Sequence, residues 1–299
     1  MIYAGHLLAC RLESLISAEF RRLAAAASTV CPGQEPECAD VGDGVALWLG
    51  EGSPVNLAVG LGMRGPVPEA AFQRLESFYH DRGAPAVVSM CPLADPSLLH
   101  LLGERGWKLT EFEHVLVLEL DAGTGGGRGA GQGAGQGAAP PPAFTGPTRA
   151  ERAEPKPGLD EAQFEVRVCL PEEREIWGRV AAHGFSDGEP ESGHEEFGRI
   201  MAERDDAILV LAWVDGEPAG TGALVVDGGV GWLSGDSTMP RFRRRGIQQA
   251  IQRHRIELAR DTGCDLAVTE SSPGSQSQRN MERVGFRIVY THVEFARHV

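Results

Sequence analysis

Segments with helical spacing alternate with short apolar runs through the second half of the chain. Apolar residues recur every three to four positions over 171–184, and a longer helix is expected from about Gly246 to Thr262, ending at Gly263. Further helices are expected up to about Met201 and over 275–284. Apolar runs predict strands at 207–214, 219–226, 230–239, 266–270 and 287–295. The pattern predicts an α/β domain.

The first half of the chain shows a fainter version of the same order. Strands are expected at 45–49, 55–61, 86–90 and 109–120, and helices at 68–82 and 97–105. Short stretches of sequence also repeat: Gly106-Trp107-Lys108-Leu109 resembles Gly285-Phe286-Arg287-Ile288, each between a helix and a closing strand. We infer a duplicated domain.

Residues 121–162 separate the two halves. Gly-Ala-Gly-Gln-Gly repeats lead into Pro140, Pro141 and Pro142, a composition that cannot bury enough apolar area to order itself. The glycines are not a phosphate cradle, because no apolar strand precedes them and no helix follows. With 299 residues, the chain is expected to form two domains, at 1–120 and 163–299, joined by this linker.

Composition excludes several classes of protein. The formal net charge of −14 argues against nucleic acid as a partner. A bilayer-spanning segment needs roughly 20 apolar residues, which no stretch approaches, and the first residues do not read as a secretory signal. We therefore expect a cytoplasmic protein without a membrane partner. The six cysteines lack metal-ligand or disulfide spacing, so no metal site is expected.

One basic cluster stands out in this acidic chain. The segment from Arg241 to Arg255 holds six arginines and no acidic residue, and it spans the junction between a predicted strand and the long helix. The first N–H groups of a helix lack intrahelical partners and favour an anion such as pyrophosphate. Gly246 would let that anion approach the backbone. A solvated basic helix face is the alternative.

This segment resembles the GNAT superfamily of acyl-CoA-dependent N-acyltransferases. The family's phosphate signature is Arg or Gln, two residues, Gly, one residue, then Gly or Ala; here it runs from Arg243 through Gly246 to Gln248, which replaces the small residue. The order of elements that follows, including Gly285-Phe286, extends the resemblance over roughly 165–299. It implies a mixed sheet, flanked by helices and splayed between the strands ending near Met239 and Ser271, with a tandem, degenerate copy in the first half.

The resemblance assigns acetyl-CoA as co-substrate and a set of residues to bind it. The pantetheine arm would pair with the strand from Asp236 to Met239, and an N–H near Thr238 or Met239 would polarise the thioester carbonyl. Ser277 and Asn280 could hold the arm. The alternative is that both side chains lie on a helix face and bind no ligand. The cofactor-binding candidates are Thr238, Met239, Arg243, Arg244, Arg245, Gly246, Ile247, Gln248, Gln249, Ser277 and Asn280.

Candidates for proton transfer are less specific. Asp236 and Glu270 lie on the two strands that flank the expected splay, so either could deprotonate the amine, and either could be structural. The family's acid tyrosine would fall at Met281, which donates no proton. Tyr290 is the candidate that could act as the acid in its place, and Ser271, Ser272 and Ser277 are further possibilities.

The expected acceptor is a small amine or an amino-terminal group. Eight acids lie between Asp187 and Asp206 and would favour a cationic amine, although solvated loop charge also explains them. The first half lacks a phosphate loop, since its stretch 61–68 holds one arginine and two prolines. A non-catalytic acyl-CoA sensor or scaffold is the alternative function. A monomer or a homodimer is expected.

Overall fold

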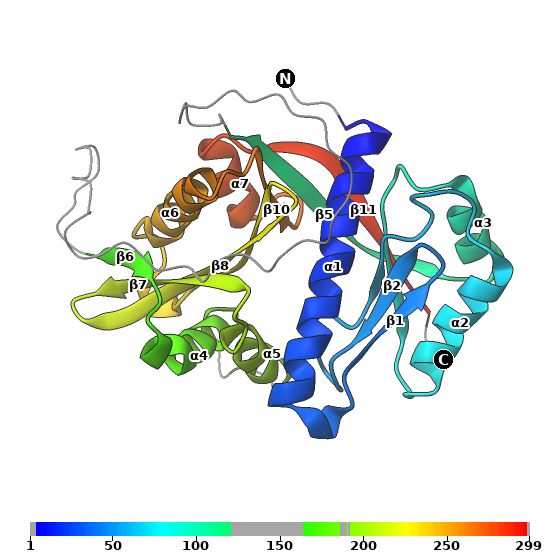
Figure 1. Cartoon of the computed structure of the whole chain (residues 1–299), viewed down its shortest axis with the longest axis horizontal. Coiled ribbons are helices and arrows are strands. Elements are labelled where there is room, and N and C mark those ends of the chain that lie inside the picture. Colours follow the sequence, from blue (N-terminus) through cyan, green and yellow to red (C-terminus); the bar gives the residue numbers. More distant parts are fainter. Residues whose placement is uncertain (1–3, 121–163, 186–189, 191, 298–299) are drawn as a thin grey trace, which may run out of the picture.

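A computed structural model describes residues 4–120, 164–185, 190 and 192–297. The described residues form one mixed sheet of eleven strands, in the order β1-β2-β3-β4-β11-β5-β10-β9-β8-β7-β6 (Figure 1). The predicted linker at 121–162 lies outside the described residues, as do most residues of the predicted acidic loop after α4.

The elements of the first half are α1 (His6–Val30), β1 (Glu37–Val41), β2 (Gly44–Trp48), β3 (Ala58–Val59), α2 (Glu69–His80), β4 (Ala86–Met90), α3 (Pro96–Glu104) and β5 (Lys108–Glu119). A short 3-10 turn, η1 (Pro32–Gln34), follows α1. From β2 onward these elements follow one another in the predicted order.

The elements of the second half are β6 (Glu165–Val168), α4 (Arg174–Phe185), α5 (Ser192–Ala202), β7 (Ala207–Val214), β8 (Glu217–Asp227), β9 (Val230–Thr238), α6 (Ile247–Asp261), β10 (Leu266–Ser271), α7 (Gln276–Arg283) and β11 (Arg287–Arg297). The 3-10 turns η2 (Pro171–Glu173) and η3 (Pro240–Phe242) precede α4 and follow β9. The series β7-β8-β9-α6-β10-α7-β11 repeats the series β1-β2-β3-α2-β4-α3-β5, which confirms the tandem arrangement.

The two halves exchange strands at the centre of the sheet. β5, from the first half, lies antiparallel between β10 and β11, while β11, from the second half, lies between β5 and β4. Because β5 and β11 also pair with each other from Arg287↔Val117 to Ala296↔Lys108, each half completes the sheet of the other. The halves therefore share one continuous backbone hydrogen-bond network.

Helix α1 runs between the two halves (Figure 1). Its buried residues recur at helical spacing: Leu12, Leu15, Ile16, Phe20, Leu23 and Ala27. They share one hydrophobic core with Leu47 of β2 and with Trp177 and Leu211 of the second half. The packing of α1 thus spans both halves, in addition to the strand exchange.

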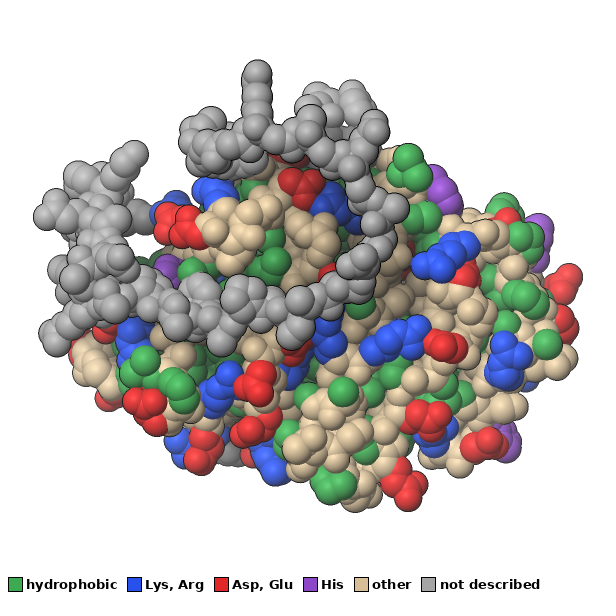
Figure 2. All heavy atoms as spheres, viewed as in Figure 1, with side chains coloured by type: hydrophobic (Ala, Val, Ile, Leu, Met, Phe, Trp, Pro, Cys, Tyr) green, Lys and Arg blue, Asp and Glu red, His purple; other side chains and the backbone are tan. Residues whose placement is uncertain are grey.

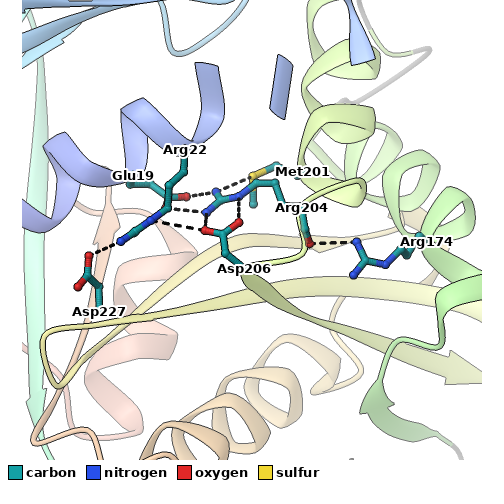
Figure 3. Close-up of polar contacts among 7 residues, drawn as sticks. All are labelled: Glu19, Arg22, Arg174, Met201, Arg204, Asp206 and Asp227. Atoms are coloured by element: carbon teal, nitrogen blue, oxygen red, sulfur yellow. Dashed lines mark hydrogen bonds and ion pairs between the residues drawn. The ribbon is translucent and has the colours of Figure 1, made fainter. Parts of the chain in front are cut away.

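A buried ion network also fastens α1 to the second half (Figure 3). Arg204, with a side chain only 1% exposed, forms a two-pronged ion pair with Glu19 of α1, and its Nη2 donates to Asp206 at 2.6 Å. Burial raises the pKa of Asp206, but the hydrogen bond and charge of Arg204 outweigh burial and hold this pKa below its usual value. Arg22 of α1 extends the network to Asp227.

Charged side chains of both signs are interspersed over the described face in Figure 2, and hydrophobic side chains occur there in small groups. None of the helices in the described ranges is long and apolar enough to cross a bilayer.

Four features of the structure differ from expectation. Helix α1, β1 and β6 were not predicted. The strand expected at 55–61 is reduced to Ala58–Val59. It is short because Asn56 is part of a turn: its side chain accepts from the N–H of Leu49 and donates to the carbonyl of Gly50.

Candidate functional site

Strands β9 and β10 separate as the sequence resemblance predicts. They pair in parallel only between Val230–Trp232 and Leu266–Val268, although β9 continues to Thr238 and β10 to Ser271. The hydroxyl of Thr269 donates to the carbonyl of Leu233 at 3.0 Å where the strands begin to diverge. Beyond this point the two strand ends border an opening in the sheet.

Helix α6 begins at this opening with an unusual backbone. Gly246, its N-cap, has φ +81°, and Arg244 also has a positive φ of +66°. The amides of residues 244–248 find no acceptor within the described part of the chain. Exposed amides at a helix N-terminus form a binding site for an anion, and the helix dipole adds to their attraction.

A cleft of about 980 Å³ lies in front of these amides. It is bordered by the end of β9, the loop before α6, and the first turns of α6 and α7. Eight of the eleven predicted cofactor-binding residues line it: Thr238, Arg243, Arg244, Gly246, Ile247, Gln248, Gln249 and Asn280. Gln276 and Arg283 of α7 line it as well, and sequence reasoning missed both.

The other three predicted cofactor-binding residues have different surroundings. Arg245 has its guanidinium 5.9 Å from the centroid of the Phe242 ring. Ser277 lies 3.5 Å from Nε2 of Gln248. The N–H of Met239 donates to the carbonyl of Ala219 at 2.9 Å, so this amide is already engaged and is a poor choice to polarise a thioester.

Asn280 organises the α7 side of the cleft. Its Nδ2 donates to Oε1 of Gln248 at 2.6 Å, and its Oδ1 accepts from Gln276 at 3.0 Å and Arg283 at 2.9 Å. Gln248, which departs from the small residue of the family signature, is therefore fixed by hydrogen bonds to α7. Met281, beside it, is buried in the core and offers no proton donor.

Asp236 lines the cleft but is held in an ion pair. Its carboxylate pairs with Arg255, whose side chain is fully buried. Nη1 of Arg255 also donates to the carbonyls of Ala223 at 2.8 Å and Ser234 at 2.9 Å, where the register between β8 and β9 shifts. This geometry supports a structural role for Asp236 in shaping the end of β9.

Glu270, near the end of β10, is not among the described residues that line the cleft and lies in a different network. Its Oε1 is 3.0 Å from Nδ1 of His292, and Nε2 of His292 is 2.7 Å from Oε1 of Glu13. Tyr290 donates to the same Glu13 oxygen at 2.7 Å. Glu270 has a side chain 28% exposed, whereas Glu13 and His292 are buried. Tyr290 thus faces α1 and is absent from the lining of the cleft.

Acidic residues surround Glu270 on neighbouring strands. Glu113 lies opposite His292, and Glu111 opposite Glu294. Burial, followed by the charge of Glu270, raises the pKa of Glu113 to about 7. Burial and the charges of Glu111 and Glu270 also raise the pKa of Glu294. The partly exposed carboxylate of Glu270 therefore lies among acidic groups whose pKa values are raised.

We expect His292 to make stability depend on pH. Burial lowers its pKa, but the charge and hydrogen bond of Glu13 and the contacts with Glu270 outweigh burial and raise that pKa to about 10. An unfolded histidine titrates near pH 6.5, so the stabilisation is complete below about 6.5 and is lost as pH rises towards 10. Denaturant unfolding of the wild type and His292→Gln between pH 6 and 10 measures it: the difference between them should shrink with rising pH, and a constant difference would contradict this assignment.

The first half carries a loop at the position of the phosphate loop, and a side chain of the protein fills it. Asp43, in the turn between β1 and β2, accepts the N–H of Gly62 at 2.7 Å and of Arg64 at 2.6 Å. An internal carboxylate thus takes amides in this loop, whereas the amides at the start of α6 are left open. This contrast supports the prediction that the first half has no phosphate site, and it does so more directly than the two prolines.

Asp43→Ala should therefore destabilise the fold without affecting the cleft of the second half. Two amides lose their acceptor, and a lost acceptor of this kind costs about 1–3 kcal/mol. Thermal unfolding with and without acetyl-CoA tests this, because the shift in Tm produced by the ligand should be the same in both proteins. Loss of that shift in the variant would place the ligand in the first half instead.

Comparisons with known proteins agree with this geometry. Residues 173–286 match the model of the acetyltransferase (GNAT) family. No curated protein matches the chain. Similar solved structures include a GCN5-related N-acetyltransferase from Kribbella flavida, which is 18% identical with a TM-score of 0.56 over 92% of this chain and 94% of that one.

Two further structures share the fold. A GCN5-related N-acetyltransferase from Sphaerobacter thermophilus is 17% identical with a TM-score of 0.52, over 76% of this chain and 66% of that one. A tandem GNAT protein from the clavulanic acid biosynthesis pathway is 11% identical, also with a TM-score of 0.52, over 85% and 78% of the two chains. Residues 173–286 in the second half of this chain thus form a domain of the acetyltransferase (GNAT) family, and the described residues share the fold of these GNAT structures.

Proposed function

We propose that this protein is an acetyl-CoA-dependent N-acetyltransferase that acetylates a small, cationic primary amine by direct attack on the thioester. The observation that carries the proposal is the row of unpaired amides at residues 244–248, which opens onto a cleft of about 980 Å³. Because Arg243 and Arg244 line the same cleft, its charge suits a pyrophosphate group.

In this proposal different residues of the cleft bind different parts of acetyl-CoA. The amides of 244–248, with Arg243 and Arg244, would hold the pyrophosphate. Gln248 and Asn280, fixed to each other, would border the pantetheine arm, which would enter the opening between β9 and β10. Acetyl-CoA, when bound, supplies an activated acetyl carbon that bonds to the amine nitrogen as the carbon–sulfur bond breaks and the CoA thiolate leaves.

Glu270 is the preferred candidate to accept the proton that the amine loses, directly or through water. Its carboxylate is partly exposed near the end of β10, while the carboxylate of Asp236 is paired with buried Arg255. The grouping of Glu113, Glu294 and Glu270 supports a cationic acceptor, because a positive charge beside these carboxyl groups would favour their ionised form. Tyr290 is not retained as an acid, since its hydroxyl is bound to Glu13.

The test is transfer from acetyl-CoA to a panel of primary amines that includes polyamines, amino sugars and peptide amino termini, with the acetylated product detected by mass spectrometry. Direct detection of product is preferable to a thiol reagent, because the described cysteines are unpaired. Glu270→Gln should lower kcat by about 10²–10⁴-fold, the range typical of general-base catalysis, and leave the Kd for acetyl-CoA unchanged. Glu282→Gln on the exposed side of α7 is the matched control.

A different outcome would favour the alternative function. If the chain binds acetyl-CoA but acetylates no amine of the panel, a non-catalytic acyl-CoA sensor becomes the better account. If Glu270→Gln transfers as fast as the wild type, transfer stands but Glu270 is not the base.

A further inference from the structure

The buried network around His292 joins the two halves of the chain and ends at Glu270, near the end of β10. Glu13 belongs to α1 of the first half, whereas His292 and Glu270 belong to strands of the second. The contacts form a continuous series, from Glu13 Oε1 to His292 Nε2 at 2.7 Å and from His292 Nδ1 to Glu270 Oε1 at 3.0 Å.

Both nitrogens of His292 face a carboxylate oxygen, so the ring donates from both sides and carries a positive charge. A neutral imidazole has only one N–H and would leave one of the two contacts without a proton. The side chains of Glu13 and His292 are each 2% exposed, so bulk solvent has little access to this contact. A carboxylate that receives a hydrogen bond from a buried, charged ring has a restricted orientation.

Glu13 is itself fixed by more than one contact. Tyr290 donates to the oxygen that His292 also contacts, and the rings of Tyr290 and His292 pack edge to face with centroids 5.3 Å apart. The second oxygen of Glu13 is buried and has no hydrogen-bond partner among the described residues. Burial of an ionised carboxylate is costly unless an opposite charge pairs with it, and here the paired cation is His292.

We propose that His292 is a positioning residue of the transfer site, held by Glu13 from the first half so that it orients the carboxylate of Glu270 towards the acceptor amine. The inference rests on the proposed function, in which Glu270 takes the amine proton. It gives the first half a defined part in catalysis: this half binds no acetyl-CoA but supplies the charge that fixes the proton acceptor. Removal of Glu13 should therefore act on transfer and not on binding of the co-substrate.

The groups that face His292 come from each element packed against it. They are Glu13 from α1, Glu270 from β10, Glu113 of β5, which lies opposite His292, Tyr290 and Glu294 on β11 itself, and Cys91, which follows β4 and lies near Glu13. All of these groups are acidic or neutral, so they favour the protonated ring, in agreement with its raised pKa.

The experiment is a double-mutant cycle on the full chain, with Glu13→Gln, Glu270→Gln and the two combined. Rates are measured with the best acceptor of the amine panel, and the Kd for acetyl-CoA is measured in parallel. Glu13→Gln should lower kcat by about tenfold or more, up to the roughly hundredfold loss that a misplacement of about 1 Å produces. The Kd for acetyl-CoA should stay within about twofold, and Glu13→Asp should restore part of the rate.

The combined variant distinguishes positioning from general damage. If Glu13 acts through Glu270, then Glu13→Gln should cause little further loss in the Glu270→Gln background. Equal losses in both backgrounds would overturn the proposal, as would an unchanged kcat in a Glu13→Gln protein that binds acetyl-CoA normally.

A second readout depends neither on turnover nor on a variant that folds. The NMR signals of the His292 ring in the wild type should report a protonated imidazole at pH 8, and a neutral ring at that pH would overturn the proposal. If no amine is acetylated while the ring is protonated, the proposed function fails and the structural link between Glu13 and His292 stands.

Discussion

Gly246→Asp is expected to raise the Kd for acetyl-CoA by about 1,000-fold. A carboxylate at this position lies among the amides of 244–248 and occupies the place assigned to the pyrophosphate. Two unit charges about 4 Å apart repel by about 4 kcal/mol at the effective dielectric constant near a protein surface, and about 1.4 kcal/mol corresponds to a tenfold change in Kd. Titration calorimetry with acetyl-CoA measures the effect.

Gly263→Asp is a closely matched control for this variant. Gly263 follows the other end of α6, has the same φ of +81°, and has no heavy atom within 4 Å of an added Cβ, as is true of Gly246. The backbone strain of the two substitutions is therefore alike, and only one of them adds charge to the cleft. Equal losses of affinity in both variants would contradict the assignment, while Gly246→Asn separates the effect of charge from that of size.

Arg204→Met is expected to lower the free energy of unfolding by about 3–5 kcal/mol, the range for breaking a buried ion pair from one side. The substitution leaves Glu19 buried in α1 without its main partner, next to Asp206, whose pKa Arg204 holds down (Figure 3). Denaturant unfolding followed by circular dichroism gives the change in free energy.

The control is Arg21→Met on α1, the helix that carries Glu19. Arg21 pairs with Asp40 at 2.6 Å, but both side chains are at least half exposed, so its loss should cost about 0–1 kcal/mol. Replacing Glu19 by Leu together with Arg204→Met should recover part of the stability, because no charge then remains buried alone in α1. An Arg204→Met protein as stable as the control would show that the network does not fasten α1 to the second half.

Much of the fold follows from local patterns in the sequence. Strands β7 to β11 and helices α6 and α7 lie where the apolar runs and the helix signals place them. Helix α1 was not predicted, although Leu12, Leu15, Ile16 and Phe20 show the helical period. The exchange of β5 and β11 could not be predicted, since two strands of similar pattern can pair in either half of a duplicated fold.

Only the part of the candidate site that one continuous segment forms could be predicted from the sequence. The start of α6, from Arg243 to Gln249, is one continuous segment, and its amides follow from the backbone of a strand–loop–helix junction. The partners of the acidic candidates come from distant segments: Asp236 meets Arg255, and Glu270 meets His292 and, through it, Glu13. Tertiary contacts of this kind determine whether a carboxylate is free to act, and spacing in the sequence carries no signal for them.

The most direct test of the account is titration calorimetry of acetyl-CoA into the full chain, analysed for stoichiometry. The open amides at the start of α6 and the amides occupied by Asp43 in the first half predict one equivalent of acetyl-CoA bound per chain. Two equivalents, or no binding at all, would contradict the central claim that the cleft of the second half is the single acyl-CoA site.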